Sequence, residues 1–194
     1  PRTLVEFFGQ SHLVGPGRVL FECVAQKKLH SMVLWGPPGT GKTTLAHILA
    51  EATGARVEIL SAVSSGVKDV RAVVERANNN ALQNFETVLF IDEIHRFSKS
   101  QQDALLPYVE SGLFTLVGAT TENPSFELNK ALLSRARVHV LKALTDDELG
   151  AVLSQALADK VRGLGEVKIE ITAEHRAQLI SLCGGDARRL LSLL

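Results

Sequence analysis

The chain carries a glycine-rich stretch whose spacing leaves few choices of fold, Gly36-Pro37-Pro38-Gly39-Thr40-Gly41-Lys42-Thr43. It matches the phosphate-binding P-loop pattern, G-x-x-x-x-G-K followed by Ser or Thr, at every fixed position. Residues 32–35 before it are all apolar, as in a buried strand, and residues 44–52 after it place their leucines and isoleucine on one helical face. The stretch therefore lies between a strand and the start of a helix, where backbone N–H groups and the helix dipole attract phosphate.

The residue types in this stretch suit a nucleoside triphosphate and Mg²⁺. Its glycines let the backbone wrap around a phosphate without Cβ clashes, and its two prolines lack N–H groups and stiffen the approach. Lys42 supplies a positive charge to the β- and γ-phosphates, and the Thr43 hydroxyl is a predicted Mg²⁺ ligand. The predicted ATP contacts of this stretch are Gly36, Pro37, Pro38, Gly39, Thr40, Gly41, Lys42, Thr43 and Thr44.

Composition narrows the class of protein. A chain of 194 residues with 45% hydrophobic and 22% charged residues is typical of one globular domain, or of one domain with a small satellite. No apolar run approaches the length of a membrane span, so we expect no membrane partner.

The first residue is proline rather than methionine, which indicates an excised fragment. Zero net charge argues against a strongly basic nucleic-acid-binding surface. The two cysteines, Cys23 and Cys183, lie far apart in the sequence, and we expect them to be reduced thiols in a cytosolic protein.

Five short segments have the patterns of strands in a parallel sheet. Residues 32–35, 88–91 and 114–119 are apolar on both faces and predict central strands, whereas residues 56–60 and 137–141 alternate and predict edge strands. A strand order of 5-1-4-3-2 satisfies both conditions and inserts strand four between strands one and three. With helices expected between the strands, the predicted fold class is α/β, a three-layer sandwich.

The pattern becomes wholly helical towards the C-terminus. Thr145 and Glu148 have the spacing of a capping box, the reciprocal hydrogen-bond pattern that begins a helix. We therefore expect an α/β nucleotide-binding core over residues 1–143 and a small helical lid over residues 144–194. The helical segments predicted in the lid are residues 146–160, 173–183 and 186–194.

A second group of polar residues follows the central strands. Asp92 ends an apolar run at the strand terminus where open α/β sheets bind their ligands, and its carboxylate is a predicted Mg²⁺ ligand. Glu93 comes next and can accept a proton from the water that attacks the γ-phosphate. At the end of strand four, the Thr121 hydroxyl can orient that water. His95 is expected to have a structural or coupling role rather than a catalytic one.

Two positions are candidates for a further positive charge at the γ-phosphate. Arg135 precedes the last strand and is expected at the rim of the sheet, from which an arginine can reach the nucleotide of a neighbouring subunit. Arg188, or its neighbour Arg189, opens the last helix and can fold back over the nucleotide of its own chain. An ordinary exposed arginine is the alternative at each position.

These residues together resemble the AAA+ ATPases. In that family Thr121 matches the first sensor, Arg135 the arginine finger and Arg188 the second sensor. The segment FFGQSHLVGPGRVL resembles the one that lines the adenine pocket, which implies contacts from Gln10 and His12. Within AAA+, the segments HRFSKSQQDALLP and ATTENPSFELN resemble the RarA/MgsA proteins, which are relatives of the eukaryotic Werner-helicase-interacting ATPase.

The resemblance implies a function in replication-fork maintenance, recombination and repair. It implies ATP hydrolysis with Mg²⁺ at a subunit interface, stimulated by gapped or single-stranded DNA or by DNA ends. It further implies single-strand-binding protein as a partner, a homotetramer for the full-length protein, and a cytoplasmic, nucleoid-associated location. Because the family continues beyond the second sensor, the lid is expected to be truncated at its C-terminus.

Four other functions stay open. A clamp loader or a Holliday-junction branch-migration motor is the nearest alternative, although both lack the segment HRFSKSQQDALLP. A protein-unfolding motor is disfavoured because the loop of residues 61–66 has no aromatic residue. A small-molecule kinase is disfavoured by Glu93 beside Asp92, which favours water as the acceptor. A nucleotide-gated binding module without useful turnover is the last alternative.

Overall fold

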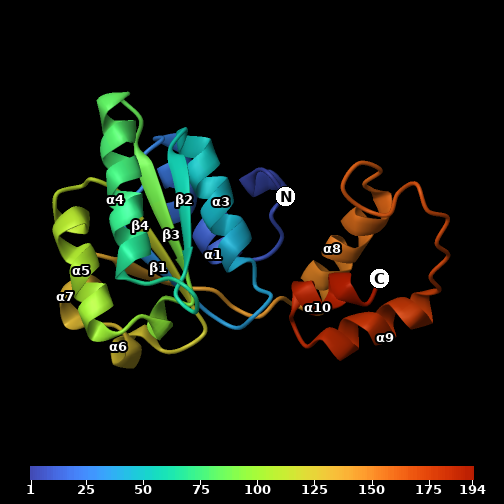
Figure 1. The fold of residues 1–194 in the computed structure, drawn as a ribbon. Helices are drawn as coiled ribbons and strands as arrows, with labels where there is room; N and C mark the ends of the chain where they lie inside the picture. Colours follow the sequence, from blue (N-terminus) through green and yellow to red (C-terminus); the bar gives the residue numbers. More distant parts are fainter.

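The computed structural model describes residues 1–194 as an α/β core followed by a smaller helical lid (Figure 1). A five-stranded parallel sheet forms the middle layer of the core, in the order β2-β3-β4-β1-β5. This order confirms the predicted 5-1-4-3-2 arrangement and the α/β fold class. The strands are β1 (Met32–Trp35), β2 (Arg56–Ser61), β3 (Thr87–Asp92), β4 (Thr115–Thr120) and β5 (Arg137–Val140).

Helices cover both faces of the sheet (Figure 1). One face carries α1 (Ser11–Val14), α2 (Val19–Ala25) and α3 (Lys42–Thr53). The other face carries α4 (Val67–Leu82), α5 (Lys99–Glu110), α6 (Pro124–Glu127) and α7 (Lys130–Leu133). Two 3-10 turns, η1 (Leu4–Glu6) and η2 (Ile94–Arg96), complete the core.

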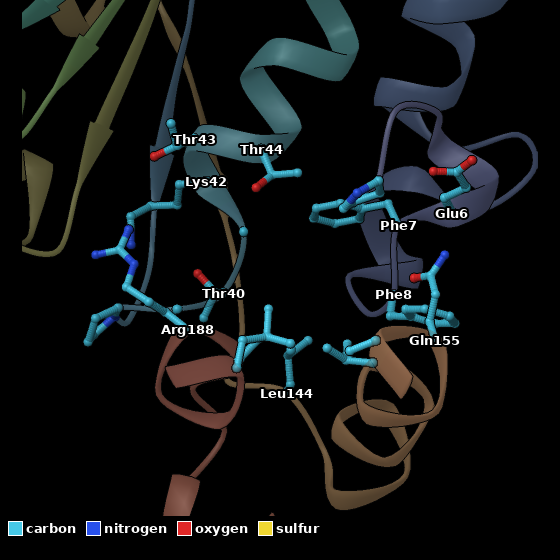
Figure 2. Close-up of a pocket in the computed structure, with 18 of the residues that line it drawn as sticks. Glu6, Phe7, Phe8, Thr40, Lys42, Thr43, Thr44, Leu144, Gln155 and Arg188 are labelled. Carbon is cyan, nitrogen blue, oxygen red and sulfur yellow. The ribbon is translucent and has the colours of Figure 1, made fainter. Parts of the chain in front are cut away.

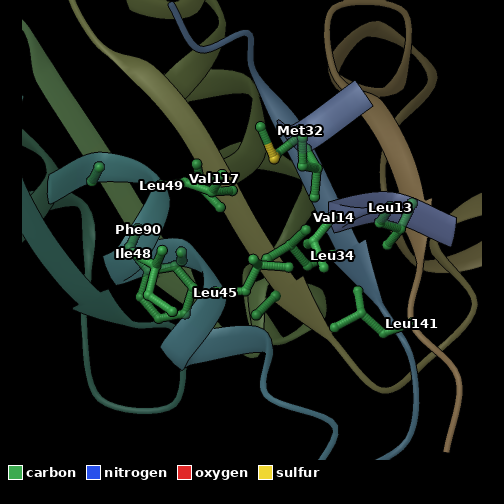
Figure 3. Close-up of a cluster of buried hydrophobic side chains, with 14 of the residues drawn as sticks. Leu13, Val14, Met32, Leu34, Leu45, Ile48, Leu49, Phe90, Val117 and Leu141 are labelled. Atoms are coloured by element: carbon green, nitrogen blue, oxygen red, sulfur yellow. The ribbon is translucent and has the colours of Figure 1, made fainter. Parts of the chain in front are cut away.

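Alternating side chains of the central strands fill two separate cores. Met32 and Leu34 of β1 point to the α3 side, where Leu45 and Leu49 pack against them (Figure 3). Val33 belongs to the core on the other face. Since each fully buried leucine stabilises the fold by roughly 1.5–3 kcal/mol, both faces of β1 must stay covered, and this is why its sequence is apolar throughout.

The register of the sheet brings the ends of three strands to one level. Trp35 at the end of β1 pairs with Thr120 at the end of β4, and Ile91 of β3 pairs with Gly118 of β4. The residues that follow β1, β3 and β4 are the P-loop, Glu93 and Thr121. Three segments far apart in the sequence therefore meet at the carboxyl edge of the sheet.

The lid forms a small body of three helices, α8 (Asp146–Ala158), α9 (Ala173–Cys183) and α10 (Ala187–Ser192). Thr145 and Glu148 cap α8 reciprocally, as predicted: the Glu148 N–H donates to Thr145 Oγ1 and the Thr145 N–H donates to Glu148 Oε2. We propose a boundary between residues 143 and 144, because Leu141 packs in the core whereas Leu144 packs among the lid helices.

Several sequence predictions about the chain as a whole can be compared with the structure. The helices α8 and α10 are shorter than predicted, since α8 ends at Ala158 and α10 spans Ala187–Ser192. Cys23 and Cys183 are both free and buried. None of the helices has the combination of length and apolar character that a membrane span needs.

A pair of histidines joins the edge strand β5 to the segment before β1. His139 Nε2 lies 3.1 Å from His30 Nε2, and His30 Nδ1 lies 3.5 Å from the Cys23 thiol. Burial, together with the nearby His30 and Arg137 as smaller causes, lowers the pKa of His139 to about 4. Burial is also the main cause that lowers the pKa of His30. With both pKa values lowered, both rings are neutral near pH 7, and the Nε2 of one ring donates to the Nε2 of the other.

This pair predicts a loss of stability in mild acid. Above an ordinary histidine pKa of about 6.5 the ring is neutral in both folded and unfolded chains. As the pH falls from 6.5 towards 4, His139 becomes protonated in the unfolded chain but stays largely neutral in the folded chain. The free energy of unfolding should therefore drop by about 3 kcal/mol. Urea denaturation at several pH values between these limits measures the drop.

The matched variants are His139→Gln, which removes the buried titrating ring, and His47→Gln, which removes an exposed histidine on α3. We expect the pH dependence to shrink in the first variant and to persist in the second. An equal loss of stability between pH 7 and 4 in wild type and His139→Gln would contradict this assignment.

Candidate nucleotide-binding site

A cavity of about 500 Å³ opens between the core and the lid (Figure 2), a volume suited to a small-molecule ligand. Four parts of the chain line it: the P-loop, the ends of β3 and β4, the N-terminal segment and the lid. Phe7 and Phe8 lie on one side of the cavity, and Arg188 lies on the other side (Figure 2). The predicted site residues that line it are Pro38, Gly39, Thr40, Gly41, Lys42, Thr43, Thr44, Asp92, Glu93, Thr121 and Arg188.

The P-loop is folded around its own lysine. Lys42 begins α3 and is 9% exposed, and its Nζ donates to the carbonyl oxygens of Gly36 at 2.7 Å and Pro37 at 2.8 Å. Gly41 has a φ of 91°, and a Cβ there would lie 2.7 Å from the Phe7 ring, so no other residue fits without rearrangement. The loop thus forms a tight cradle, closed on one side by Phe7.

Positively and negatively charged groups both surround this cradle. Burial lowers the pKa of Lys42, whereas Glu93 and Asp92 raise it and Arg188 lowers it. Charged groups of both signs therefore lie near the Lys42 ammonium group, on the lining of one cavity. The Thr43 hydroxyl and the Asp92 carboxylate open on the same cavity, and oxygen donors of these two kinds fit Mg²⁺.

Glu93 has an unusual backbone. Its φ of 52° and ψ of 45° lie in the left-handed region, which costs a residue with a side chain roughly 1–2 kcal/mol. Its Oε2 lies 3.2 Å from Nδ1 of His95, and the same nitrogen lies 2.9 Å from Oγ1 of Thr120. Backbone strain of this kind often marks a functional position.

The two threonines at the end of β4 have different surroundings. Thr121 follows the last residue of β4 and lines the same cavity as Glu93. Thr120 is fully buried and turns towards His95 instead. The contact between His95 and Thr120 was not predictable from the sequence, because the two residues are 25 positions apart and share no pattern.

The lid touches the P-loop directly. The Ala187 N–H donates to the Gly39 carbonyl at 3.2 Å, and Asp186 caps α10 by accepting from the Arg189 N–H at 3.0 Å. The Leu144 N–H donates to the Gly185 carbonyl at 3.1 Å, which ties the start of the lid to the start of α10. The cavity wall formed by Arg188 is therefore fixed relative to the cradle.

Four of the predicted contacts lie outside the cavity lining. Gly36 and Pro37 present their carbonyls to Lys42. The side chain of Gln10 exchanges two hydrogen bonds with the backbone of Lys142, at 2.7 and 2.8 Å, and His12 Nε2 lies 2.8 Å from the Val140 carbonyl.

The contacts of Gln10 and His12 hold the N-terminal segment against the end of β5. By holding this segment in place, they position Phe7 and Phe8, two lining residues that the sequence prediction missed. The available signal was the Phe-Phe-Gly tripeptide next to Gln10 in the segment that resembles an adenine-pocket wall.

Arg135 lies away from the cavity of its own chain. Its guanidinium pairs with the Glu110 carboxylate at the end of α5, and it donates to the Ala131 carbonyl at 2.8 Å and to Ser134 Oγ at 2.9 Å. The Arg135 side chain is 37% exposed. It is therefore available at the surface and absent from the pocket that Arg188 lines.

Comparison with known proteins identifies the family. Residues 32–144 match the family described as "ATPase family associated with various cellular activities (AAA)". The chain belongs to this AAA family. Membership of this ATPase family implies that the chain binds a nucleotide, and residues 32–144 contain all of the P-loop, Asp92, Glu93 and Thr121.

The predicted resemblance to the RarA/MgsA proteins within the AAA family is confirmed. Replication-associated recombination protein A of Coxiella burnetii is 58% identical over all 194 residues, which make up 44% of that protein. ATPase WRNIP1 of Dictyostelium discoideum is 42% identical over the same 194 residues, 22% of its length. The chain thus spans less than half the length of the curated relatives it matches.

A solved structure with the same fold is the RuvB Holliday junction branch migration motor of Thermotoga maritima. It is 32% identical with a TM-score of 0.79, and the match covers all of this chain and 63% of that one. The AAA+ fold predicted from the sequence is therefore confirmed in this structure.

The contact between P-loop and lid generates a prediction at Gly39. A Cβ there would lie 1.7 Å from Asp186 Oδ1 and 2.9 Å from the Asp186 Cα, so Gly39→Ala must push α10 away from the cradle. We expect nucleotide affinity to fall by about tenfold or more, which corresponds to about 1.4 kcal/mol. Calorimetric titration with ADP measures the change.

Gly54 provides the matched control, because its φ of 74° resembles the 69° of Gly39 but no atom lies within 4 Å of the added Cβ. Both alanine variants should lose about 1 kcal/mol of unfolding free energy through the left-handed backbone, and Gly39→Ala should lose more through the contact with Asp186. Only Gly39→Ala should lose nucleotide affinity, and equal affinities in the two variants would contradict the role of the lid contact.

Proposed function

We propose that this chain binds ATP with Mg²⁺ in the cavity between core and lid and hydrolyses it, with Glu93 as the general base. The observation that carries the proposal is the meeting of Lys42, Asp92 and Glu93 at a glycine cradle in one cavity. A buried cation suits phosphate, and two adjacent carboxylates suit a metal ligand and a base.

Each residue has a role that follows from its position. The backbone N–H groups of residues 39–43 hold the phosphates, and Lys42 exchanges the Gly36 and Pro37 carbonyls for phosphate oxygens. Thr43 and Asp92 would hold Mg²⁺, which supplies neutralisation of phosphate charge when bound.

The remaining residues act on the attacking water and on the closure of the site. Thr121 orients the water and Glu93 accepts its proton. Arg188 brings a further positive charge from the lid to the same cavity. Phe7 and Phe8 form an apolar wall that suits a nucleotide base.

We propose that the full-length protein is a DNA-dependent ATPase in replication-fork maintenance, recombination and repair. The similarity to Replication-associated recombination protein A supports this assignment. The same similarity supports gapped or single-stranded DNA and DNA ends as ligands, single-strand-binding protein as a partner, a homotetramer and a nucleoid-associated location in the cytoplasm.

A second candidate function is Holliday-junction branch migration. The likeness in fold to the RuvB branch migration motor supports it. The higher identity to Replication-associated recombination protein A, 58% against 32%, favours the first assignment. Comparing the stimulation of ATP hydrolysis by gapped DNA and by a four-way junction separates the two candidates.

The proposed chemistry predicts different effects at Glu93 and Lys42. In the full-length protein, Glu93→Gln should keep ATP affinity but lower turnover by about 10²-fold or more, because it removes the base. Lys42→Ala should lose ATP affinity, because it removes the charge that faces the phosphates. Calorimetry with Mg²⁺ and ATP, and phosphate release with and without gapped DNA, measure both effects.

Glu51→Gln on the exposed side of α3 is the control and should leave both quantities unchanged. Turnover near the wild-type value in Glu93→Gln would move the role of base to another residue. Unchanged ATP affinity in Lys42→Ala would remove the P-loop assignment itself.

We propose that Arg135 completes the site of a neighbouring subunit. Its exposure, and its distance from the cavity of its own chain, support an action between chains in a head-to-tail contact. Full-length Arg135→Ala should bind ATP normally yet turn it over about 10³-fold more slowly, the range for a missing arginine finger.

Mixing the full-length variants Arg135→Ala and Lys42→Ala should restore turnover, because some interfaces then pair an intact P-loop with an intact arginine. Arg137→Ala, two residues further along on β5, is the control and should retain wild-type turnover. A mixture no more active than its separate components would contradict the action between chains.

A further inference from the structure

A series of buried polar groups in contact with one another lies behind the Glu93 carboxylate. It runs from Glu93 Oε2 to His95 Nδ1 at 3.2 Å and from the same nitrogen to Thr120 Oγ1 at 2.9 Å. Thr120 Oγ1 also accepts from the Glu122 N–H at 3.0 Å and lies 3.2 Å from the Glu122 carbonyl. The His95 side chain is only 8% exposed, so water does not replace these partners.

Nδ1 of His95 faces two oxygen atoms, Glu93 Oε2 and Thr120 Oγ1, and it cannot donate to one and accept from the other at the same time. When Nδ1 of His95 carries a proton, it can donate to the Glu93 carboxylate, and the Thr120 hydroxyl then donates to the Glu122 carbonyl. When Nδ1 has no proton, the Thr120 hydroxyl can donate to it, and the lone pair then repels the carboxylate. The proton arrangement at His95 therefore decides whether Glu93 is held.

The end of β4 connects these polar groups to the nucleotide cradle. The Gly36 N–H at the start of the P-loop donates to the Thr120 carbonyl at 3.2 Å. The next residue, Thr121, lines the cavity. Thr120 thus contacts His95 through its side chain, and its backbone connects to the P-loop at Gly36 and to Thr121.

The Glu93 carboxylate depends on its contact with His95 to stay in one place. In the left-handed conformation, with a φ of 52°, its side chain begins from a sparsely populated geometry. Its carboxylate is one-third exposed, and the only basic side chain within 4.0 Å of it is His95. Without that partner, the carboxylate would be free to turn in the cavity.

We propose that His95 is a positioning residue that holds the Glu93 carboxylate by Oε2 and leaves Oε1 free to accept a proton, with Thr120 setting the proton arrangement at His95. The proposal rests on the proposed function, in which Glu93 is the general base. It adds a residue that acts on turnover through Glu93 without touching the nucleotide.

The test compares two substitutions in the full-length protein. His95→Phe keeps a ring but has no donor, and it should lower kcat by up to about 10²-fold, the loss that a misplaced catalytic group produces. The KM for ATP should change by no more than about twofold, since no binding contact is removed. His95→Asn places an amide N–H near the position of Nδ1 and should recover most of the turnover.

A structural role would give a different pattern, in which both substitutions lower stability and turnover together. Thermal unfolding of each variant measures stability independently. If His95→Phe does not fold, His95→Gln replaces it, because its amide extends towards the position of Nε2 rather than Nδ1. Equal turnover in the asparagine variant and the variant without the Nδ1 donor would overturn the proposal.

A double substitution separates this proposal from the proposed function. In a Glu93→Gln background, His95→Phe should have almost no further effect on turnover, because His95 acts only through Glu93. A full additional loss in that background would overturn the role of His95. If Glu93→Gln alone leaves turnover unchanged, the assignment of Glu93 as the general base in the proposed function fails. A large effect of Glu93→Gln with no effect of His95→Phe removes only the further inference.

Discussion

A buried ammonium group at the start of α3 is the interaction on which the site depends. Removing a charge from water costs several kcal/mol unless the charge is paired or fully hydrogen-bonded. Lys42 meets this requirement through two backbone carbonyls of its own loop, at 2.7 and 2.8 Å, and through the nearby Asp92 and Glu93. The loop is thereby held closed in the shape of a phosphate site.

The sheet supplies the second condition. With β4 between β1 and β3, the carboxyl ends of three adjacent strands lie level, and each delivers a different chemical group to the cavity. The lid then closes the open side, where its α10 contacts the P-loop backbone at Gly39. A ligand in this cavity touches core and lid together, so its binding can couple the positions of the two bodies.

The sequence predicted those parts of the fold that depend on local patterns. Apolar and alternating segments gave the strand order, and the P-loop with Asp92, Glu93 and Thr121 gave one wall of the cavity. The helices α6 and α7 escaped prediction because four residues are too few to show a helical period. Contacts such as that between Gln10 and Lys142 join residues 132 positions apart, and only the folded chain reveals them.

The central claim is that Lys42 is held by its own loop in readiness for phosphate. A crystal structure of the protein with Mg²⁺ and a non-hydrolysable ATP analogue tests this most directly. The account predicts that Lys42 Nζ leaves the carbonyls of Gly36 and Pro37 and contacts the β- and γ-phosphates, with the base beside Phe7 and Phe8. An analogue bound outside this cavity, with both carbonyl contacts of Lys42 intact, would contradict it.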